Sequence, residues 1–328
     1  MQCPENSRGV SNRSSERRFH LEIVVFTVML WCAGLLISHP AGANCVQDDL
    51  ERMVCIGPSV SRIVSFAPSL TEIVFALGHG DHLVGRSNFC DYPAEATRVP
   101  IVGSYTRPAL ERVIALKPDL VLTTKDAAQK GLVVKLEGLG IPVFVSRTLK
   151  MDEIFDLVKR IGRLLGDEDV AMALVEDLQK RRSAVKNRLK GVGKPTALLV
   201  VGLKPLFVAG GQSFVGSVLR EAKCVNIAED VILDYPKYSI EEVIRRDPDI
   251  ILVLNKECSS HESCFGPWKR YPSLSAVKSG RVYKVNADSL ARPGPRIIDG
   301  LEALADILHP NESASHPTGG RPVTTRRR

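Results

Sequence analysis

The sequence has few aromatic residues and lacks the short motifs that mark the common catalytic sites. Phe, Trp and Tyr together account for 5% of its 328 residues. It contains no GxSxG nucleophile turn, no HExxH zinc-binding helix and no Walker A phosphate loop. The familiar serine hydrolases, zinc peptidases and P-loop nucleotide hydrolases are therefore excluded as classes for this protein.

Long apolar runs and clustered positive charge are also scarce beyond residue 43. After that point no apolar run approaches the length of about 20 residues that a membrane-spanning helix needs. The formal net charge is +7, and three of these charges belong to the terminal arginines Arg326, Arg327 and Arg328. Without its two ends the chain is nearly balanced in charge, so no basic stripe indicates a nucleic-acid partner.

The two ends predict segments outside the fold. Residues 1–43 combine a basic start, an apolar run from Ile23 to Ile37 and a closing Ala-Gly-Ala, which is the layout of a secretory signal peptide. We expect export, with the mature chain starting near Asn44; a leader retained as a membrane anchor is the alternative. Residues 310–328 are rich in Ser, Thr, Pro, Gly and Arg, and they predict a disordered tail.

Cysteines are even in number after the leader, which favours disulfides in an exported protein. The stretch CVQDDLERMVC predicts a hairpin that turns near Leu50. Such a hairpin would set Cys45 opposite Cys55 and allow them to pair. The partners of Cys90 and Cys224 are left open.

The stretch CSSHESC allows two interpretations. Cys258, His261 and Cys264 would supply three zinc ligands, but no fourth is evident and structural zinc sites use four. A disulfide between Cys258 and Cys264 suits an oxidising compartment better. We therefore predict a second disulfide and no metal site.

Strand-like apolar runs alternate with helical patterns in each half of the chain, which predicts mainly parallel sheets flanked by helices. Between the halves, Met151–Leu165 and Glu168–Leu189 contain no proline and predict two helices, the second about 33 Å long. The expected boundaries are an N-terminal lobe at 44–150, a helical linker at 151–192 and a C-terminal lobe at 193–309.

One predicted helix start carries a recognisable cap. In SLTEIVFALG, Ser69 is followed three residues later by Glu72, and glycine closes the segment. This spacing predicts a capping box at the beginning of the helix and a stop at its end.

A helix–turn–strand unit occurs twice. LERVIALKPDLVLTT (110–124) and IEEVIRRDPDIILVL (240–254) share Glu, Val, Ile, Pro, Asp and Leu at equivalent positions. Glu111 and Glu241 begin the two helices, where the helix dipole favours a carboxylate. If the two halves are related by a pseudo-twofold axis, the two acids are also suited to docking onto arginines of a two-fold symmetric partner.

Several of the few aromatic residues fall in loops predicted to follow strand ends. Loops of this kind carry ligand contacts in open α/β sheets, and flat apolar walls suit a large planar ligand. These residues are Phe89, Tyr105, Phe207 and Tyr235.

The segments RIVSFAPSLTEIVFALG, FCDYP, LERVIALKPDLVLTT and ARPGPRIIDGLEAL together resemble the periplasmic substrate-binding proteins of ABC importers for cobalamin and siderophores. Within that family the chain is most similar to the cobalamin-binding members, over about residues 46–308. The resemblance implies an α/β fold of two Rossmann-like lobes joined by a single long helix, with the ligand cleft between the lobes. It also implies a periplasmic location and no enzymatic activity.

The resemblance implies roles for individual residues. Phe89, Tyr105, Phe207 and Tyr235 would stack on the corrin, with Tyr105 and Tyr235 standing where the family has tryptophan. Asp288 and Arg292 would be polar ligand contacts in the loop before the closing helix. Glu111 and Glu241 match the two acids that dock onto arginines of the transmembrane permease.

The function expected from the resemblance is delivery of cobalamin or a related corrinoid to the permease dimer of an ABC importer. The protein would be a monomer, and the corrinoid would be its cargo rather than a cofactor. A ferric siderophore or haem is the alternative cargo, although a pocket for an anionic chelate should be cationic. A hydrolase using Glu111 and Glu241 is the remaining alternative, which would need the two carboxylates within about 5 to 10 Å of each other.

Overall fold

The computed structural model describes residues 43–127, 130–254 and 260–310. The fold below is that of the compact unit that begins at Asn44. The predicted signal peptide and nearly all of the predicted tail lie outside the described residues. Within the described ranges, no helix is both long and apolar enough to cross a membrane.

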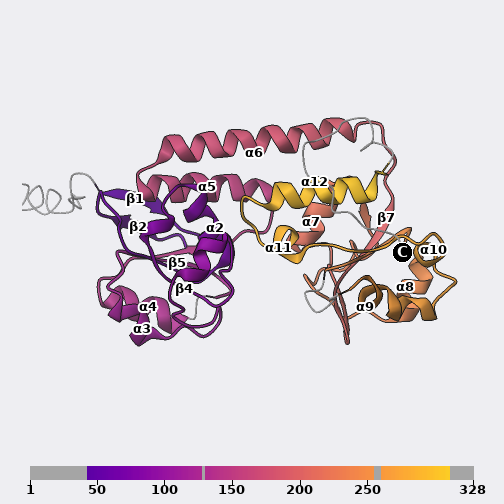
Figure 1. The fold of residues 1–328 in the computed structure, drawn as a ribbon, viewed down its shortest axis with the longest axis horizontal. Helices are drawn as coiled ribbons and strands as arrows, with labels where there is room; N and C mark the ends of the chain where they lie inside the picture. Colours follow the sequence, from indigo (N-terminus) through magenta and orange to yellow (C-terminus); the bar gives the residue numbers. More distant parts are fainter. Residues whose placement is uncertain (1–42, 128–129, 255–259, 311–328) are drawn as a thin grey trace, which may run out of the picture. The chain divides into compact units, whose positions relative to one another are not determined.

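A parallel four-stranded sheet with the order β4-β3-β5-β6 lies at the centre of the first half (Figure 1). Its strands are β3 (Ile63–Ser65), β4 (Leu83–Arg86), β5 (Leu120–Thr124) and β6 (Val143–Ser146). Nearly all of their residues are buried, as expected for a parallel sheet covered on both faces. The helices of this half are α2 (Pro68–Ala76), α3 (Leu110–Ala115) and α4 (Lys130–Gly138), with 3-10 turns η1 (Gly80–His82) and η2 (Ala94–Arg98).

The predicted disulfide hairpin precedes this sheet. Strands β1 (Asn44–Gln47) and β2 (Met53–Ile56) pair antiparallel, and the register sets Cys45 opposite Cys55. The two cysteines form a disulfide, so this prediction is confirmed.

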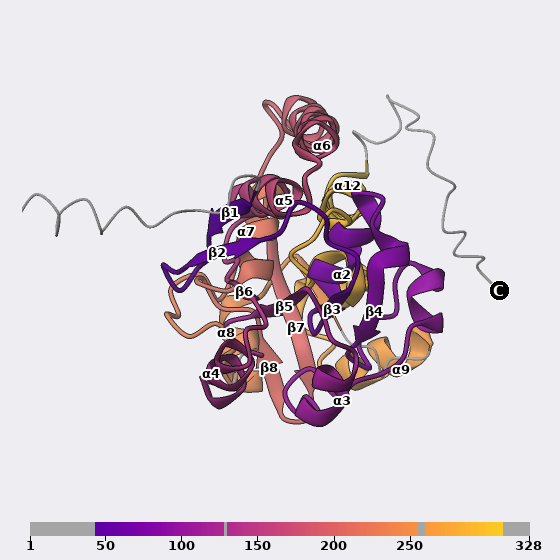
Figure 2. The ribbon, with the colours of Figure 1, turned by 90° about the vertical axis from the view of Figure 1, so that its left-hand side faces the viewer.

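Two helices follow the first half, as predicted. They are α5 (Met151–Leu165) and α6 (Glu168–Arg188), separated by Gly166 in a left-handed conformation at φ 80°. The 21 residues of α6 give it a length of about 32 Å. Helix α5 lies between α6 and the strands of the first half, and α6 also runs alongside α12 (Figures 1 and 2).

The second half is built on a five-stranded sheet with the order β11-β10-β7-β8, in which β9 also pairs with β7. Its strands are β7 (Thr196–Leu203), β8 (Leu206–Val208), β9 (Val225–Asn226), β10 (Ile250–Val253) and β11 (Val282–Lys284). Its helices are α7 (Phe214–Glu221), α8 (Ile240–Arg246), α9 (His261–Phe265), α10 (Ser275–Lys278), α11 (Ala287–Leu290) and α12 (Ile297–Leu308), with the 3-10 turn η3 (Gly266–Arg270). The sheet is mainly parallel as predicted, and the exception is the antiparallel pair β7–β8.

The predicted capping box at Ser69 is wrong. Helix α2 begins at Pro68 with Ala67 as its N-cap, so the cap lies two residues before Ser69. Proline is favoured at the first helical position because its missing N–H would have no helical partner there. Ser69 is therefore buried inside the first turn, and Glu72 pairs with Arg296 instead. The predicted helix stop agrees with Gly78, which has a φ of 84°.

The two copies of the repeated unit have the same local structure. Each is a short helix, a turn and a central strand, namely α3–β5 and α8–β10. In each copy the residue directly before the proline has a positive φ. This angle is 45° at Lys117 and 38° at Asp247. One residue after the proline, Asp119 accepts backbone hydrogen bonds from Ser61 and Arg62, each 2.9 Å long, beside the start of β3. Its counterpart Asp249 accepts one of 2.8 Å from Thr196 at the start of β7.

Candidate functional site

The C-terminal edge of the first sheet carries two of the predicted ligand residues. Phe89 lies in a turn after β4 and has 51% of its surface exposed. Tyr105 lies half-buried against the hydrophobic core, and its hydroxyl forms a 2.7 Å hydrogen bond with Oγ1 of Thr124 at the end of β5. The C-terminal ends of parallel strands meet at one edge, and this is where open α/β sheets bind ligands.

Tyr235 comes from the second half but lies near the same charged group as Tyr105. Burial is the largest cause that raises the pKa of each phenol, and the Asp126 carboxylate just after β5 raises both pKa values further. Asp234 adds to the rise in the pKa of Tyr235, whereas the hydrogen bond with Thr124 partly lowers that of Tyr105. The two phenols, one from each half, therefore both lie within electrostatic range of the Asp126 carboxylate.

Phe207 differs from its predicted setting. It was expected in a loop after a strand, but it is the central residue of β8, which pairs with β7. The reason is a tight turn at Lys204 and Pro205 that folds the chain back on β7. Phe207 is partly buried and forms a bridge with Lys237, two residues after Tyr235.

Asp288 and Arg292 belong to a network of ion pairs that joins the two halves of the chain. Arg292 lies 2.6 Å from Asp91, 2.9 Å from Asp288 and 3.6 Å from Glu72. Glu72, on α2, accepts hydrogen bonds of 2.5 and 3.0 Å from Arg296 at the start of α12. The predicted polar residues are therefore already paired with protein groups.

The part of the network around Glu72 is shielded from water, whereas Asp91 is 47% exposed. The Glu72 side chain is only 2% exposed, and the Arg296 guanidinium lies 3.7 Å from the centre of the Tyr92 ring. Burial alone would lower the pKa of Arg296, but hydrogen bonding to Glu72 raises it. The same balance holds for Arg292, whose pKa is raised by its hydrogen bond to Asp91 and by the nearby carboxylates.

Sequence patterns did not identify Glu72, Asp91, Tyr92 and Arg296 as partners in this network. The only local signal was the pair of arginines in ARPGPR just before the closing helix. Asp91 and Glu72 are 201 and 224 residues away from the arginines they bind, so no spacing in the sequence identifies them.

Glu111 and Glu241 occupy equivalent exposed positions at the beginnings of α3 and α8. Among the described residues, neither carboxylate forms an ion pair or a side-chain hydrogen bond. The adjacent acid Glu242 behaves differently, because Arg245 and Arg246 both pair with it. The hydroxyl oxygen of Ser239 caps α8 by accepting a hydrogen bond from the backbone N–H of Glu242, whereas α3 has no side-chain cap.

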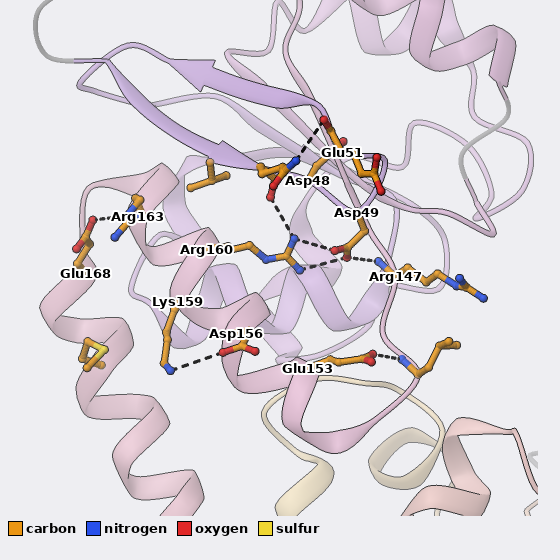
Figure 3. A pocket seen from close by; sticks show the side chains of 14 residues that line it. Asp48, Asp49, Glu51, Arg147, Glu153, Asp156, Lys159, Arg160, Arg163 and Glu168 are labelled. Carbon is orange, nitrogen blue, oxygen red and sulfur yellow. Dashed lines mark hydrogen bonds and ion pairs between the residues drawn. The ribbon is translucent and has the colours of Figure 1, made fainter.

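A separate groove of about 840 Å³ lies between the disulfide hairpin and the outer faces of α5 and α6 (Figure 3). It contains none of the predicted ligand residues. Its charged side chains largely pair with one another, as in Arg160 with Asp49 at 2.8 Å and Arg163 with Glu168 at 2.8 Å. The first pair holds the hairpin against α5, and the second joins the end of α5 to the beginning of α6.

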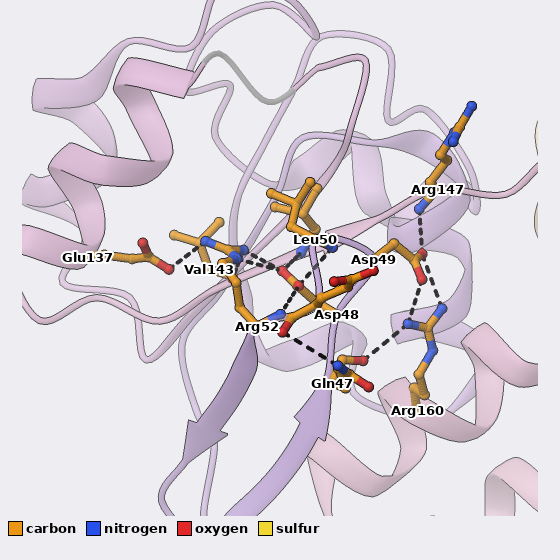
Figure 4. Close-up of polar contacts among 11 residues, drawn as sticks. Gln47, Asp48, Asp49, Leu50, Arg52, Glu137, Val143, Arg147 and Arg160 are labelled. Atoms are coloured by element: carbon orange, nitrogen blue, oxygen red, sulfur yellow. Dashed lines mark hydrogen bonds and ion pairs between the residues drawn. The ribbon is translucent and has the colours of Figure 1, made fainter.

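The turn of the hairpin is fixed by an adjacent set of polar contacts (Figure 4). The buried carboxylate of Asp48 accepts backbone hydrogen bonds from Leu50 and Arg52 and pairs with the Arg52 side chain. Arg52 also donates to the carbonyl of Val143 in β6 and to Glu137 in α4. The hairpin is thus tied to the first sheet as well as to α5.

The described part of the chain contains no cluster of His, Cys, Asp and Glu that is able to hold a metal ion. Cys264 is buried, and its predicted partner Cys258 lies outside the described residues. Cys90 and Cys224 are separate buried thiols, and burial raises the pKa of both, that of Cys224 to about 12.

Residues 63–288 match the model of the periplasmic binding protein family. The chain belongs to this family. It is 30% identical over 260 residues to the vitamin B12-binding protein of Vibrio cholerae, covering 79% of this chain and 89% of that one. It is 28% identical to the vitamin B12-binding protein of Vibrio parahaemolyticus, over 77% of this chain and 88% of that one.

Solved structures agree with this membership. The periplasmic vitamin B12 binding protein BtuF of Vibrio cholerae matches with a TM-score of 0.69 at 28% identity, over 76% of this chain and 96% of that one. A periplasmic heme binding protein from Pseudomonas aeruginosa matches with a TM-score of 0.69 at 29% identity, over 76% and 93%. The predicted α/β architecture of two lobes is thus confirmed, and the family is one of binding proteins.

Proposed function

We propose that the protein captures cobalamin or a related corrinoid in the periplasm and delivers it to an ABC importer. The observation that carries this proposal is the similarity to vitamin B12-binding proteins over more than three quarters of the chain. The aromatic loops support it, because Phe89, Tyr105 and Tyr235 offer flat surfaces to a planar macrocycle. The chain would bind one ligand as a monomer and carry out no reaction on it.

The proposed ligand site lies between two lobes. We assign 44–150 to the first lobe, 151–192 to the helical linker and 193–309 to the second. Phe89, Tyr105, Phe207 and Tyr235 would contact the corrin, with Asp288 and Arg292 at the edge of the site. Arg292 would hold its place through Asp91 and Asp288 rather than act as a free cation.

Haem is the second candidate ligand. The heme binding protein of Pseudomonas aeruginosa resembles this chain as closely in structure as BtuF does, with the same TM-score of 0.69. A free anionic siderophore is less well matched, because the arginines near the proposed site are already neutralised by Glu72, Asp91 and Asp288. A hydrolase with Glu111 and Glu241 as its acid pair has no support, since these acids belong to α3 and α8 in different halves.

A titration of the purified chain distinguishes the ligands. Cyanocobalamin, haem and a ferric hydroxamate siderophore are each added, and binding is followed by absorbance and calorimetry. We expect one-to-one binding that is tightest for cyanocobalamin. Tighter binding of haem would replace the corrinoid with the second candidate, and tighter binding of the siderophore would overturn both.

Glu111 and Glu241 are proposed to dock onto arginines of the permease. Their exposure and lack of partners among the described residues leave both carboxylates available. A charge-assisted pair that is desolvated at an interface loses about 2 kcal/mol or more on truncation, so Glu111→Ala with Glu241→Ala should weaken docking roughly several hundredfold. Docking is measured with the importer in lipid nanodiscs, and ligand affinity should stay unchanged.

Glu176→Ala is the matched control for this experiment. Glu176 is an exposed acid on α6, remote in sequence from both repeats. It should leave docking unchanged. If the double variant docks as tightly as the unmodified protein, the two glutamates serve only their own helices.

A further inference from the structure

The identical residues of the repeated unit fall into two groups. Four of the six have a reason inside the fold, because they are buried or hydrogen-bonded in both copies. In the first copy these are buried Val113, Pro118 and Leu122, and Asp119, which holds the start of the neighbouring strand. Their counterparts 130 residues later have the same environments. The remaining two, glutamate and isoleucine, have no such reason.

The isoleucines lie on the same exposed face as the glutamates. Ile114 and Ile244 each come three residues after Glu111 and Glu241, so each pair of side chains is adjacent on its helix. Ile114 is 36% exposed and Ile244 is 41% exposed, and neither belongs to the described hydrophobic cores.

Neighbouring positions of the two helices that are exposed or partly exposed have diverged. The position after the glutamate is arginine in α3 and glutamate in α8, and the position after the isoleucine is Ala115 in α3 and Arg245 in α8. A single exposed isoleucine needs no explanation. An identical exposed pair in both copies, amid neighbours that differ, indicates that the pair has a shared external contact.

We infer that glutamate and isoleucine act as one docking unit, which the chain presents twice to a two-fold symmetric membrane partner. Each copy of the partner would offer an arginine beside an apolar recess. The isoleucine would enter the recess and exclude water around the Glu–Arg pair, as surrounding contacts do at interface hot spots. The inference rests on the proposed docking role of Glu111 and Glu241 and adds the apolar half of the contact.

The test compares three variants in the docking assay with the nanodisc importer. They are Ile114→Ser with Ile244→Ser, Glu111→Ala with Glu241→Ala, and Val170→Ser. Val170 is the matched control, since it is a 44% exposed aliphatic residue on α6. Cyanocobalamin affinity and melting temperature verify that each variant is folded and binds ligand.

Ile114→Ser and Ile244→Ser should each weaken docking roughly five- to twentyfold. Each change removes the exposed apolar area of one isoleucine that docking would bury. The control should leave docking unchanged. If the glutamate variant loses docking while the isoleucine variant keeps it, this inference is overturned and the proposed docking role stands. If neither variant loses docking, the proposed role itself is overturned.

The single changes test the symmetry of the partner. Ile114→Ser and Ile244→Ser should weaken docking by similar factors, because a two-fold partner meets both with the same surface. An effect confined to one of the two would overturn the symmetric docking unit, and so would an equal loss with Val170→Ser.

Discussion

The two copies of the helix–turn–strand unit have the same backbone but different supports. Helix α3 has no side-chain cap, whereas α8 is capped by Ser239. Helix α8 also carries a cluster in which Glu242 pairs with Arg245 and Arg246, and Arg246 pairs with Asp230 at 2.6 Å. The supports have diverged while the exposed glutamate and isoleucine have not. A fold can therefore replace the contacts that brace an element and still present the same surface.

The cluster on α8 also affects the availability of Glu241. Arg245 lies four residues after Glu241, a spacing at which glutamate and arginine commonly pair on a helix. In the structure Arg245 pairs with Glu242 instead, and the Nε of Arg245 donates a 2.8 Å hydrogen bond to the Glu242 carboxylate. In α3 no second acid is needed to keep an arginine away from Glu111, because alanine occupies the position four residues after it.

The largest expected difference between the halves is in how much the free energy of unfolding depends on an acid in the first helix of each half. Glu72 on α2 pairs with Arg296, and Glu221 on α7 pairs with Arg182 of α6. Glu72→Ala leaves the mostly buried Arg296 without an acidic partner and should lower the free energy of unfolding by about 3 to 5 kcal/mol. Glu221 is less buried, so Glu221→Ala should lower it by about 1 to 2 kcal/mol. Urea unfolding measures both, and equal losses would contradict the difference in burial.

The second comparison concerns the equivalent aromatic residues Tyr105 and Tyr235. Each change to alanine should weaken corrinoid binding by about 0.5 to 1.5 kcal/mol through lost stacking. Tyr105→Ala should also lower stability, because Tyr105 contacts the core and bonds to Thr124, whereas Tyr235→Ala should not. Calorimetric titration and thermal unfolding separate the two effects. The matching phenylalanine variants keep the ring and should retain most of the affinity.

The third comparison concerns pH. Hydrogen bonds from Arg245 and Arg246 lower the pKa of Glu242 to about 2, and α3 has no counterpart. A depressed carboxylate pKa contributes stability above the unfolded pKa, near 4.5, which is lost as the pH falls towards 2. The melting temperature of Glu242→Gln should therefore lie below that of the unmodified protein at pH 7 and approach it on acidification. A gap that stays constant from pH 7 to 2 would exclude this role.

The smallest comparison concerns the two residues with positive φ. Lys117→Gly should stabilise the protein by about 0.5 kcal/mol, because glycine relieves the left-handed conformation at some cost in entropy. Asp247→Gly should destabilise it by about 1 kcal/mol, since Asp247 accepts hydrogen bonds of 2.7 Å from the backbone and hydroxyl of Ser275. Urea unfolding should give opposite signs, and stabilisation by both changes would show that the hydrogen bonds of Asp247 with Ser275 do not outweigh its backbone strain.

Local features of the fold were predictable from the sequence alone. Helix α5 has the predicted bounds, α6 ends one residue before its predicted end, and the Cys45–Cys55 hairpin pairs in the predicted register. The central strands of both repeats also lie where their apolar runs predicted them. These features depend on apolar periodicity, turn residues and caps, which act over a few residues and can be recognised in the sequence.

The tertiary structure alone decided how the candidate site is assembled. Glu72 was expected to cap its own helix, but it pairs with Arg296, 224 residues away. Phe207 was expected in a loop, but the chain folds back on β7 and makes it part of a strand. Tyr105 and Tyr235 each lie five residues before their copy of the repeated unit, yet one bonds to Thr124 while the other is 47% exposed. Ion pairs between distant segments and the burial of a side chain depend on which surfaces the fold brings together, and no local pattern encodes that choice.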